Sequence, residues 1–119
     1  MTEPVMSDTI VTEAVLQRLA SLISARRAET ASKSYTRELL DGGPQRCAKK
    51  LGEEATETVI AALVQDRRAL IREAADLIYH LLVLLESKHV SLGEVLAELN
   101  ARIGTSGHAE KASREMKPS

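Results

Sequence analysis

Two long stretches of helical periodicity, residues 44–64 and 67–88, are separated by about two residues near Gln65. Apolar side chains recur every three or four positions in both stretches, which is the spacing of one face of an α-helix. A connection this short forces two consecutive helices to pack side by side in opposite directions. The sequence therefore predicts an antiparallel helical hairpin at the centre of the chain.

Shorter helical segments are expected on both sides of this hairpin. No strand-like alternation and no internal repeat interrupt them, so the predicted fold class is all-α. The apolar stripe of the first hairpin helix is expected to consist of Cys47, Leu51, Ala55, Val59 and Ala62. The expected helices cover about residues 11–27, 35–40, 44–64, 67–88 and 92–103.

Capping residues mark several of these helix boundaries. Ser34 and Asp66 each precede a helical stretch and carry side-chain oxygens that suit the N-cap position. Ser91 and Glu94 match the Ser-x-x-Glu capping box at the start of the last helix. Gly42-Gly43 is expected to end the short helix before Pro44 begins the next one.

The length of 119 residues suits one small domain with a limited core. We expect this domain to cover residues 9–103. Residues 1–8 look like a flexible N-terminal tail, and the polar residues 104–119 look like a flexible C-terminal tail.

Composition argues against several classes of partner. The 17 acidic and 16 basic side chains nearly cancel, and the only aromatic side chains are two tyrosines, so nucleic-acid binding is not expected. The longest apolar run, Leu81 to Leu85, is far too short to span a membrane, and residues 1–8 lack a signal-peptide pattern. Cys47 is the only cysteine, which fits a reducing compartment. The sequence predicts a cytoplasmic protein without a membrane or nucleic-acid partner.

Acidic residues occur at helical spacing on both arms of the predicted hairpin, within residues 53–57 and 73–76. Residues three or four apart share a helix face, and residues equally far from the turn at Gln65 lie at about the same height. The pairs expected to face each other are Glu57 with Glu73, Glu54 with Asp76, and Lys50 with His80. The hairpin should therefore bring four carboxylates together, with Glu53 beside them and a basic pair at one end.

Four converging carboxylates repel one another unless a cation lies between them. Oxygen ligands suit Mg²⁺, which completes its coordination shell with water and substrate phosphates. Such a site polarises a phosphoryl group and activates water, while Lys50 and His80 could hold the rest of a polyphosphate. The pattern predicts hydrolysis of a phosphoanhydride.

A solvated surface is the more common explanation for acidic residues on a helix. Two features weigh against it here. The acidic strip of the first arm continues into Ile60, Ala61 and Val64, so this face is expected to meet other protein. The second arm is apolar around most of its circumference from Leu77 to Leu85, as in a helix that is buried on all sides. Buried acids need a partner or a metal ion.

Three segments carry a resemblance to a known family. They are Ser34-Tyr35-Thr36 with the following Leu39-Leu40 and Gly43-Pro44, then Lys50-Leu51-Gly52-Glu53-Glu54-Ala55-x-Glu57, and then Glu73-Ala74-Ala75-Asp76-Leu77-Ile78-Tyr79-His80-Leu81-Leu82. Over about residues 12–103 the chain resembles the phosphoribosyl-ATP pyrophosphohydrolases. The acidic motifs alone would indicate only the wider MazG-like group. The first segment and the Asp-Leu-x-Tyr-His run narrow the resemblance from that group to this one family.

This resemblance implies a MazG-like helical bundle completed by homodimerisation. It implies Mg²⁺-dependent hydrolysis of the α–β phosphoanhydride of 1-(5-phosphoribosyl)-ATP, which yields 1-(5-phosphoribosyl)-AMP and pyrophosphate in histidine biosynthesis. The implied metal ligands are Glu54, Glu57, Glu73 and Asp76. The residues expected to act in catalysis are Glu53 and Lys50, and those expected to bind substrate are Lys50, Tyr35, Tyr79 and His80.

Simpler interpretations stay open beside these roles. His80 is equally well explained as a core histidine with its own hydrogen-bond partners, and Tyr79 is better explained by packing than by ligand binding. Two other functions also fit the sequence. A MazG-like enzyme that clears noncanonical nucleoside triphosphates would carry the same acidic motifs, and a non-enzymatic helical dimer would carry them on a solvated face.

Overall fold

The computed structural model describes residues 4–29 and 34–103. Helices are the only regular secondary structure in that part of the chain, which confirms the predicted all-α class. None of the described helices is both long and apolar enough to cross a membrane. The elements are α1 (Pro4–Ala25), the 3₁₀-helix η1 (Arg26–Ala28), α2 (Tyr35–Asp41), α3 (Gly43–Val64), α4 (Arg67–Ser87) and α5 (Leu92–Arg102).

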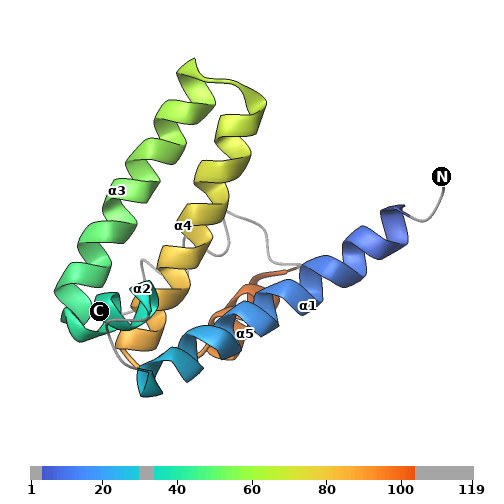
Figure 1. The fold of residues 1–119 in the computed structure, drawn as a ribbon. Coiled ribbons are helices and arrows are strands. Elements are labelled where there is room, and N and C mark those ends of the chain that lie inside the picture. The colour runs from blue at the N-terminus through green and yellow to red at the C-terminus, as the bar shows by residue number, and fades with distance from the viewer. Residues whose placement is uncertain (1–3, 30–33, 104–119) are drawn as a thin grey trace, which may run out of the picture.

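Helices α3 and α4 form the predicted antiparallel hairpin, and its tip stands clear of the other helices (Figure 1). Asp66 caps α4, because its side chain accepts a hydrogen bond from the backbone N–H of Ala69 at 2.8 Å. The hydroxyl of Thr58 lies 2.8 Å from the carbonyl oxygen of Glu54 and 3.1 Å from that of Glu73. Thr58 therefore links the two arms next to the acidic residues.

The remaining helices gather at the base of the hairpin, where α3 begins and α4 ends (Figure 1). The buried core lies there as well, and four helices contribute to it. Its members are Ile23 of α1, Leu39 of α2, Cys47 of α3, and Leu82 and Val83 of α4. The base is thus the packed part of the chain, and it holds the hairpin in place.

The predicted caps are confirmed. Ser34 accepts a hydrogen bond from the Arg37 backbone N–H at 3.1 Å, and Ser91 and Glu94 form a complete capping box. The Glu94 carboxylate accepts a hydrogen bond from the backbone N–H of Ser91 at 2.8 Å, which lowers the pKa of Glu94. Gly43 has φ +82°, a left-handed conformation that side chains disfavour, so a glycine suits the junction between α2 and α3.

The structure differs from the sequence-based expectations at three points, namely the start of α1, the apolar stripe of α3 and the burial of α4. Helix α1 begins at Pro4 rather than near Val11, so residues 4–8 of the expected tail are helical; proline suits a first helical turn. The expected apolar stripe of α3 is wrong at Val59, which is 58% exposed, and at Ala62, which is also exposed, because Ala61 faces the hairpin interior instead. The expected flexible tail at 104–119 lies outside the described residues.

The third difference concerns α4, which this chain alone does not bury on all sides. Ile78 is 43% exposed and Leu81 is 39% exposed. Helix α3 covers one side of α4, and α1 and α2 cover its C-terminal half. The side that carries Ile78 and Leu81 stays partly exposed, so the expectation of all-round burial is wrong for a single chain.

Candidate metal centre

Three carboxylates converge between the arms of the hairpin. Glu54 and Glu57 project from α3 and Glu73 projects from α4, and one oxygen from each lies within 4.8 Å of the other two. Glu54 is seven residues from both Cys47 and Ala61, the buried residues of α3, so it points toward the hairpin interior. The same face of α3 therefore builds the core at one end and the acidic cluster further along.

Two oxygens of this cluster are buried without a hydrogen-bond partner among the described residues. They are Oε2 of Glu54 and Oε1 of Glu73. A buried carboxylate oxygen without a partner is costly, and native structures rarely leave one unpaired. A hard divalent cation with a preference for oxygen ligands would satisfy both atoms. The donor set present therefore fits a Mg²⁺ ion.

The electrostatics of the cluster show the same crowding. Burial raises the pKa of Glu54, and the nearby Glu57 and Asp76 raise it further. Burial also raises the pKa of Glu73, again with contributions from Glu57 and Asp76. These carboxylates are held where their ionised forms repel one another, and a bound cation would reverse that effect.

A consequence is expected in the pH dependence of stability of the metal-free protein. A carboxyl whose pKa is higher in the folded state than the ordinary 4.5 stabilises the fold fully below that value. This contribution is lost as the pH rises through the raised pKa. We therefore expect the Tm in a chelating buffer to fall between pH 4.5 and neutrality, and added Mg²⁺ to restore it at neutral pH.

The double variant Glu54→Gln/Glu73→Gln isolates this effect from other titrating groups. It should show a smaller decrease of Tm with pH than the unmodified chain in the same chelating buffer, because glutamine does not ionise. Thermal unfolding followed by circular dichroism at several pH values would measure both. Identical pH profiles of the two proteins would contradict the assigned repulsion.

Asp76 adjoins the cluster without being one of its three central members. Its side chain is exposed, yet its charge raises the pKa of both Glu54 and Glu73. The predicted facing of Glu57 with Glu73 is confirmed, and Asp76 is an electrostatic neighbour of Glu54 as expected. The role of Asp76 as a fourth metal ligand remains a prediction.

Lys50 and Glu53 lie beside the carboxylate cluster. Lys50 Nζ is 3.2 Å from Glu53 Oε1, and both side chains are partly exposed. This hydrogen bond raises the pKa of Lys50, and the proximity of Tyr35 contributes further. Glu53 therefore belongs to the basic end of the site rather than to the group of three central carboxylates. The catalytic roles expected for Lys50 and Glu53 remain predictions.

His80 is buried and has a partner on each ring nitrogen. Its Nδ1 is 2.9 Å from the backbone carbonyl oxygen of Asp76, so Nδ1 carries a proton and donates. In the neutral ring Nε2 is then an acceptor, and the Tyr35 hydroxyl lies 3.4 Å from it. These contacts fit a core histidine that orients the half-exposed Tyr35, while direct contact of either residue with substrate remains a prediction.

Tyr79 packs behind this pair. Its hydroxyl is hydrogen-bonded to Thr36, and its ring stacks on that of Tyr35 with centroids 6.4 Å apart. Burial raises the pKa of Tyr79. The packing interpretation of Tyr79 is therefore supported by its contacts. Sequence reasoning missed Thr36, although it lies in the Ser34-Tyr35-Thr36 segment, because its partner is 43 residues away.

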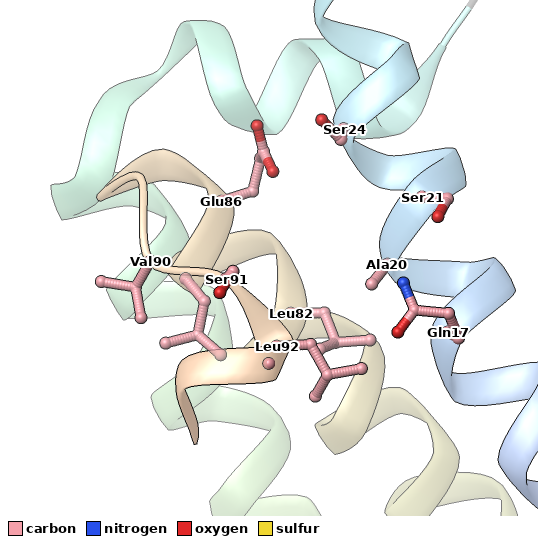
Figure 2. Close-up of a pocket in the computed structure, with 11 residues that line it drawn as sticks. Gln17, Ala20, Ser21, Ser24, Leu82, Glu86, Val90, Ser91 and Leu92 are labelled. Atoms are coloured by element: carbon pink, nitrogen blue, oxygen red, sulfur yellow. The ribbon is translucent and has the colours of Figure 1, made fainter. Parts of the chain in front are cut away.

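Apart from the carboxylate cluster, a pocket lies between α1, the end of α4 and the start of α5 (Figure 2). It has a volume of about 220 Å³, and its lining includes Leu82, Leu92 and several serines. Glu86, its one acidic lining residue, forms an ion pair with Arg27. The pocket shares no residue with the carboxylate cluster, which therefore stays the candidate centre for chemistry.

The fold and the cluster define a class of protein, namely small all-α proteins with a cluster of carboxylates between two antiparallel helices that could hold a divalent cation. The sequence model of one family in particular, described as phosphoribosyl-ATP pyrophosphohydrolase, matches residues 16–103. The chain belongs to this family. The match covers α2 to α5 completely, and the C-terminal part of α1 from residue 16 onward.

Bacterial relatives support the same assignment. A protein of Rhodobacter capsulatus named phosphoribosyl-ATP pyrophosphatase is 54% identical over 99 residues, which is 83% of this chain and 96% of the relative. A protein of the same name from Azorhizobium caulinodans is 54% identical over 110 residues, covering 92% of this chain and 98% of its own length. The resemblance inferred from the motifs is thus confirmed at the level of the family.

Proposed function

We propose that this chain hydrolyses the α–β phosphoanhydride of 1-(5-phosphoribosyl)-ATP to 1-(5-phosphoribosyl)-AMP and pyrophosphate, with Mg²⁺, in histidine biosynthesis. Family membership supports the substrate, since the relatives are named for it. The observation that carries the metal dependence is the pair of buried, unpartnered oxygens on Glu54 and Glu73. Oxygen ligands of this kind bind Mg²⁺ together with the phosphates of a nucleotide.

Each side chain of the centre then has a definite task. Glu54, Glu57 and Glu73 would hold the cation, with Asp76 completing the acidic wall. Bound there, Mg²⁺ would polarise the phosphoryl group and make a water molecule more acidic. Lys50, beside the cluster, would neutralise the charge that builds up on phosphate oxygens.

The tyrosines and His80 would form the wall against the nucleoside. Nε2 of His80 accepts a hydrogen bond from the Tyr35 hydroxyl, so the lone pairs of that oxygen stay available to a hydroxyl or amine of the substrate. Tyr35 is 48% exposed, and Tyr79 supports its ring from behind. Glu53 holds Lys50 in place and presents an exposed carboxylate close to the cluster, which makes it a candidate catalytic residue.

Turnover of a panel of nucleotides tests this function. The purified chain should hydrolyse phosphoribosyl-ATP with a kcat/KM far above that for ordinary or oxidatively damaged nucleoside triphosphates. A preference for the damaged triphosphates would instead support a MazG-like role in clearing noncanonical nucleotides. No hydrolysis of any substrate in the presence of Mg²⁺ would overturn the proposed chemistry altogether.

We further propose that the active form is a homodimer. The hairpin tip exposes large apolar side chains that a soluble monomer rarely leaves uncovered as a group. Leu63 is 78% exposed and Val64 is 75% exposed, and Ile71 begins the apolar side of α4 that continues with Ile78 and Leu81. A second copy of the chain can cover this surface, because a symmetric dimer places identical apolar faces against each other.

Leu63→Asp should convert the dimer to a monomer at micromolar concentration, since a carboxylate would be buried at the interface without a partner. Sedimentation velocity measures the change. Ala48→Asp is the matched control, because it adds the same charge to an exposed position of α3 outside this apolar surface and should leave the dimer intact. A stable and fully active monomer of the unmodified chain would contradict the proposal.

A further inference from the structure

A basic groove, whose lining residues all belong to α3, lies between the carboxylate cluster and the beginning of that helix. Arg46, Lys50, Glu53 and Glu57 follow the spacing i, i+4, i+7 and i+11, so they lie on one strip of the helix. A hollow of about 540 Å³ accompanies the first part of this strip, and Arg46, Lys49, Lys50 and Glu53 line it together with Gln45. Any ligand bound at the cluster can therefore extend along three cations.

Two of these three cations have no ion-pair partner within residues 4–29 and 34–103. Lys50 is paired with Glu53, whereas neither Arg46 nor Lys49 forms an ion pair with a carboxylate in the part of the chain that the structure describes. Both line the same hollow on adjoining turns of one helix. An anion placed there would gain charge-assisted hydrogen bonds without displacing an existing partner.

The absence of a side chain at Gly42 leaves room for the side chain of Arg46. A Cβ atom at Gly42 would lie 2.5 Å from Cδ of Arg46, closer than non-bonded carbon atoms approach, and a tight 3.0 Å from its Cβ. The backbone of Gly42 has φ −73°, which any residue adopts, so conformation does not require a glycine at this position. The lack of space does require a glycine, because the Arg46 side chain fills the position that a Cβ atom of residue 42 would occupy.

We infer that Arg46, with Lys49 beside it, binds the 5-phosphate of the phosphoribosyl group, an assignment that rests on the proposed function. At about 1.5 Å per residue, Lys50 is about 6 Å along the helix axis from Glu54, whereas Arg46 is about 12 Å away. Lys50 is thus placed for the phosphates next to the cation, and Arg46 for an anion further along.

The substrate has two anionic ends that match this layout. Its triphosphate is attached to one ribose, and its phosphomonoester is attached to a second ribose on the opposite side of the adenine. Ordinary nucleoside triphosphates lack the second anion. Arg46 and Lys49 are therefore specificity-determining residues, since they distinguish phosphoribosyl-ATP from ATP by a group that takes no part in bond cleavage.

Steady-state kinetics of Arg46→Ala, Lys49→Ala and the double variant test this assignment. We expect KM for phosphoribosyl-ATP to rise roughly tenfold for each single variant and about a hundredfold for the double variant. The value of kcat should stay within about threefold, because the contact is the same in the ground and transition states. Arg68→Ala, which removes an exposed cation at the other end of the hairpin, is the matched control and should change neither constant.

Gly42→Ala separates the position of Arg46 from its charge. The new methyl group should displace the Arg46 side chain and raise KM, although all charges remain. In the Arg46→Ala background the same change should have little further effect, because the side chain it displaces is already gone. Equal effects of Gly42→Ala in both backgrounds would show that Gly42 acts in another way and would overturn this account of Arg46.

Two probes identify the phosphate that binds in the groove. An NMR titration with ribose 5-phosphate should shift amide signals of residues 43–50 in the unmodified chain, and the double variant should lose this binding. Inhibition by pyrophosphate should be the same in both proteins. If the double variant instead loses pyrophosphate inhibition and keeps ribose 5-phosphate binding, the groove holds the terminal phosphates and the assignment is wrong.

These measurements keep the two proposals apart. If the unmodified chain turns over phosphoribosyl-ATP but the double variant has an unchanged KM, the assignment of the groove fails and the proposed function stands. If the unmodified chain does not turn over phosphoribosyl-ATP, the proposed function fails, and with it the assignment of the phosphate to this substrate. The ribose 5-phosphate titration would then still decide whether the groove binds a phosphomonoester.

Discussion

Glu57→Gln is expected to abolish turnover of phosphoribosyl-ATP and to leave the fold intact. Glu57 has an oxygen within 4.8 Å of one oxygen each of Glu54 and Glu73 and raises the pKa of both, so its charge acts on both other members of the cluster. Its neutralisation removes a metal ligand and weakens Mg²⁺ binding. It also removes repulsion between carboxylates, so the Tm of the metal-free variant should equal or exceed that of the unmodified chain.

Activity assays at saturating Mg²⁺ and thermal unfolding in a chelating buffer measure the two halves of this prediction. Glu98→Gln is a suitable control, since it neutralises a carboxylate of α5 that lies outside the cluster and forms an exposed ion pair with Arg102. That variant should keep full activity. Full activity in Glu57→Gln would rule out the proposed metal centre, and unfolding of the variant would show that Glu57 has a structural role instead.

Lys50→Ala should lower kcat/KM for phosphoribosyl-ATP by roughly ten- to a thousandfold, the range for losing one charged contact to a phosphate in the transition state. The structure places Lys50 next to the carboxylates and beside Tyr35. Mg²⁺ affinity should change little or improve, because a cation close to the carboxylates is removed. Steady-state kinetics with saturating Mg²⁺ measure the effect.

The competing explanation is that Lys50 only forms a surface ion pair with Glu53, three residues along the helix. In that case the kinetics would be unchanged and only the thermal stability would fall slightly. Glu53→Gln helps to separate the two, since it removes the ion pair and keeps the lysine. A purely structural pair predicts the same small loss of stability for both variants and no change in kcat/KM for either.

The hairpin and the carboxylate cluster could be predicted from the sequence because both depend on short-range rules. Helical periodicity and the side-chain caps at Ser34, Asp66 and Ser91 set the helix boundaries within a few residues. The short connection at Gln65 then fixed which residues of α3 face which residues of α4. Glu57 and Glu73 meet for that reason alone.

Other features depend on contacts between distant segments, which spacing does not encode. Tyr35 meets His80 across 45 residues, and Thr36 meets Tyr79 across 43. The position of Arg46 depends on the space left by Gly42, which becomes visible only when side chains are placed.

The burial of apolar side chains on α3 and α4 was also predicted wrongly for the single chain. Apolar residues on α3 and α4 were expected to face protein, yet Ile60, Val64 and Ile78 are exposed in the single chain. An apolar pattern indicates that a surface needs cover, but it does not say whether the same chain or a partner supplies it. The proposed homodimer accounts for this difference, and the apolar surface of the hairpin would then belong to the interface.

Product analysis of the unmodified chain tests the central claim most directly. Phosphoribosyl-ATP incubated with the protein and Mg²⁺, followed by ³¹P NMR, should yield phosphoribosyl-AMP and pyrophosphate in equal amounts. The reaction should stop when a chelator removes the cation and resume when Mg²⁺ is added back. Release of orthophosphate with a nucleoside diphosphate product, or undiminished turnover in the chelator, would contradict cleavage of the α–β bond at the carboxylate cluster.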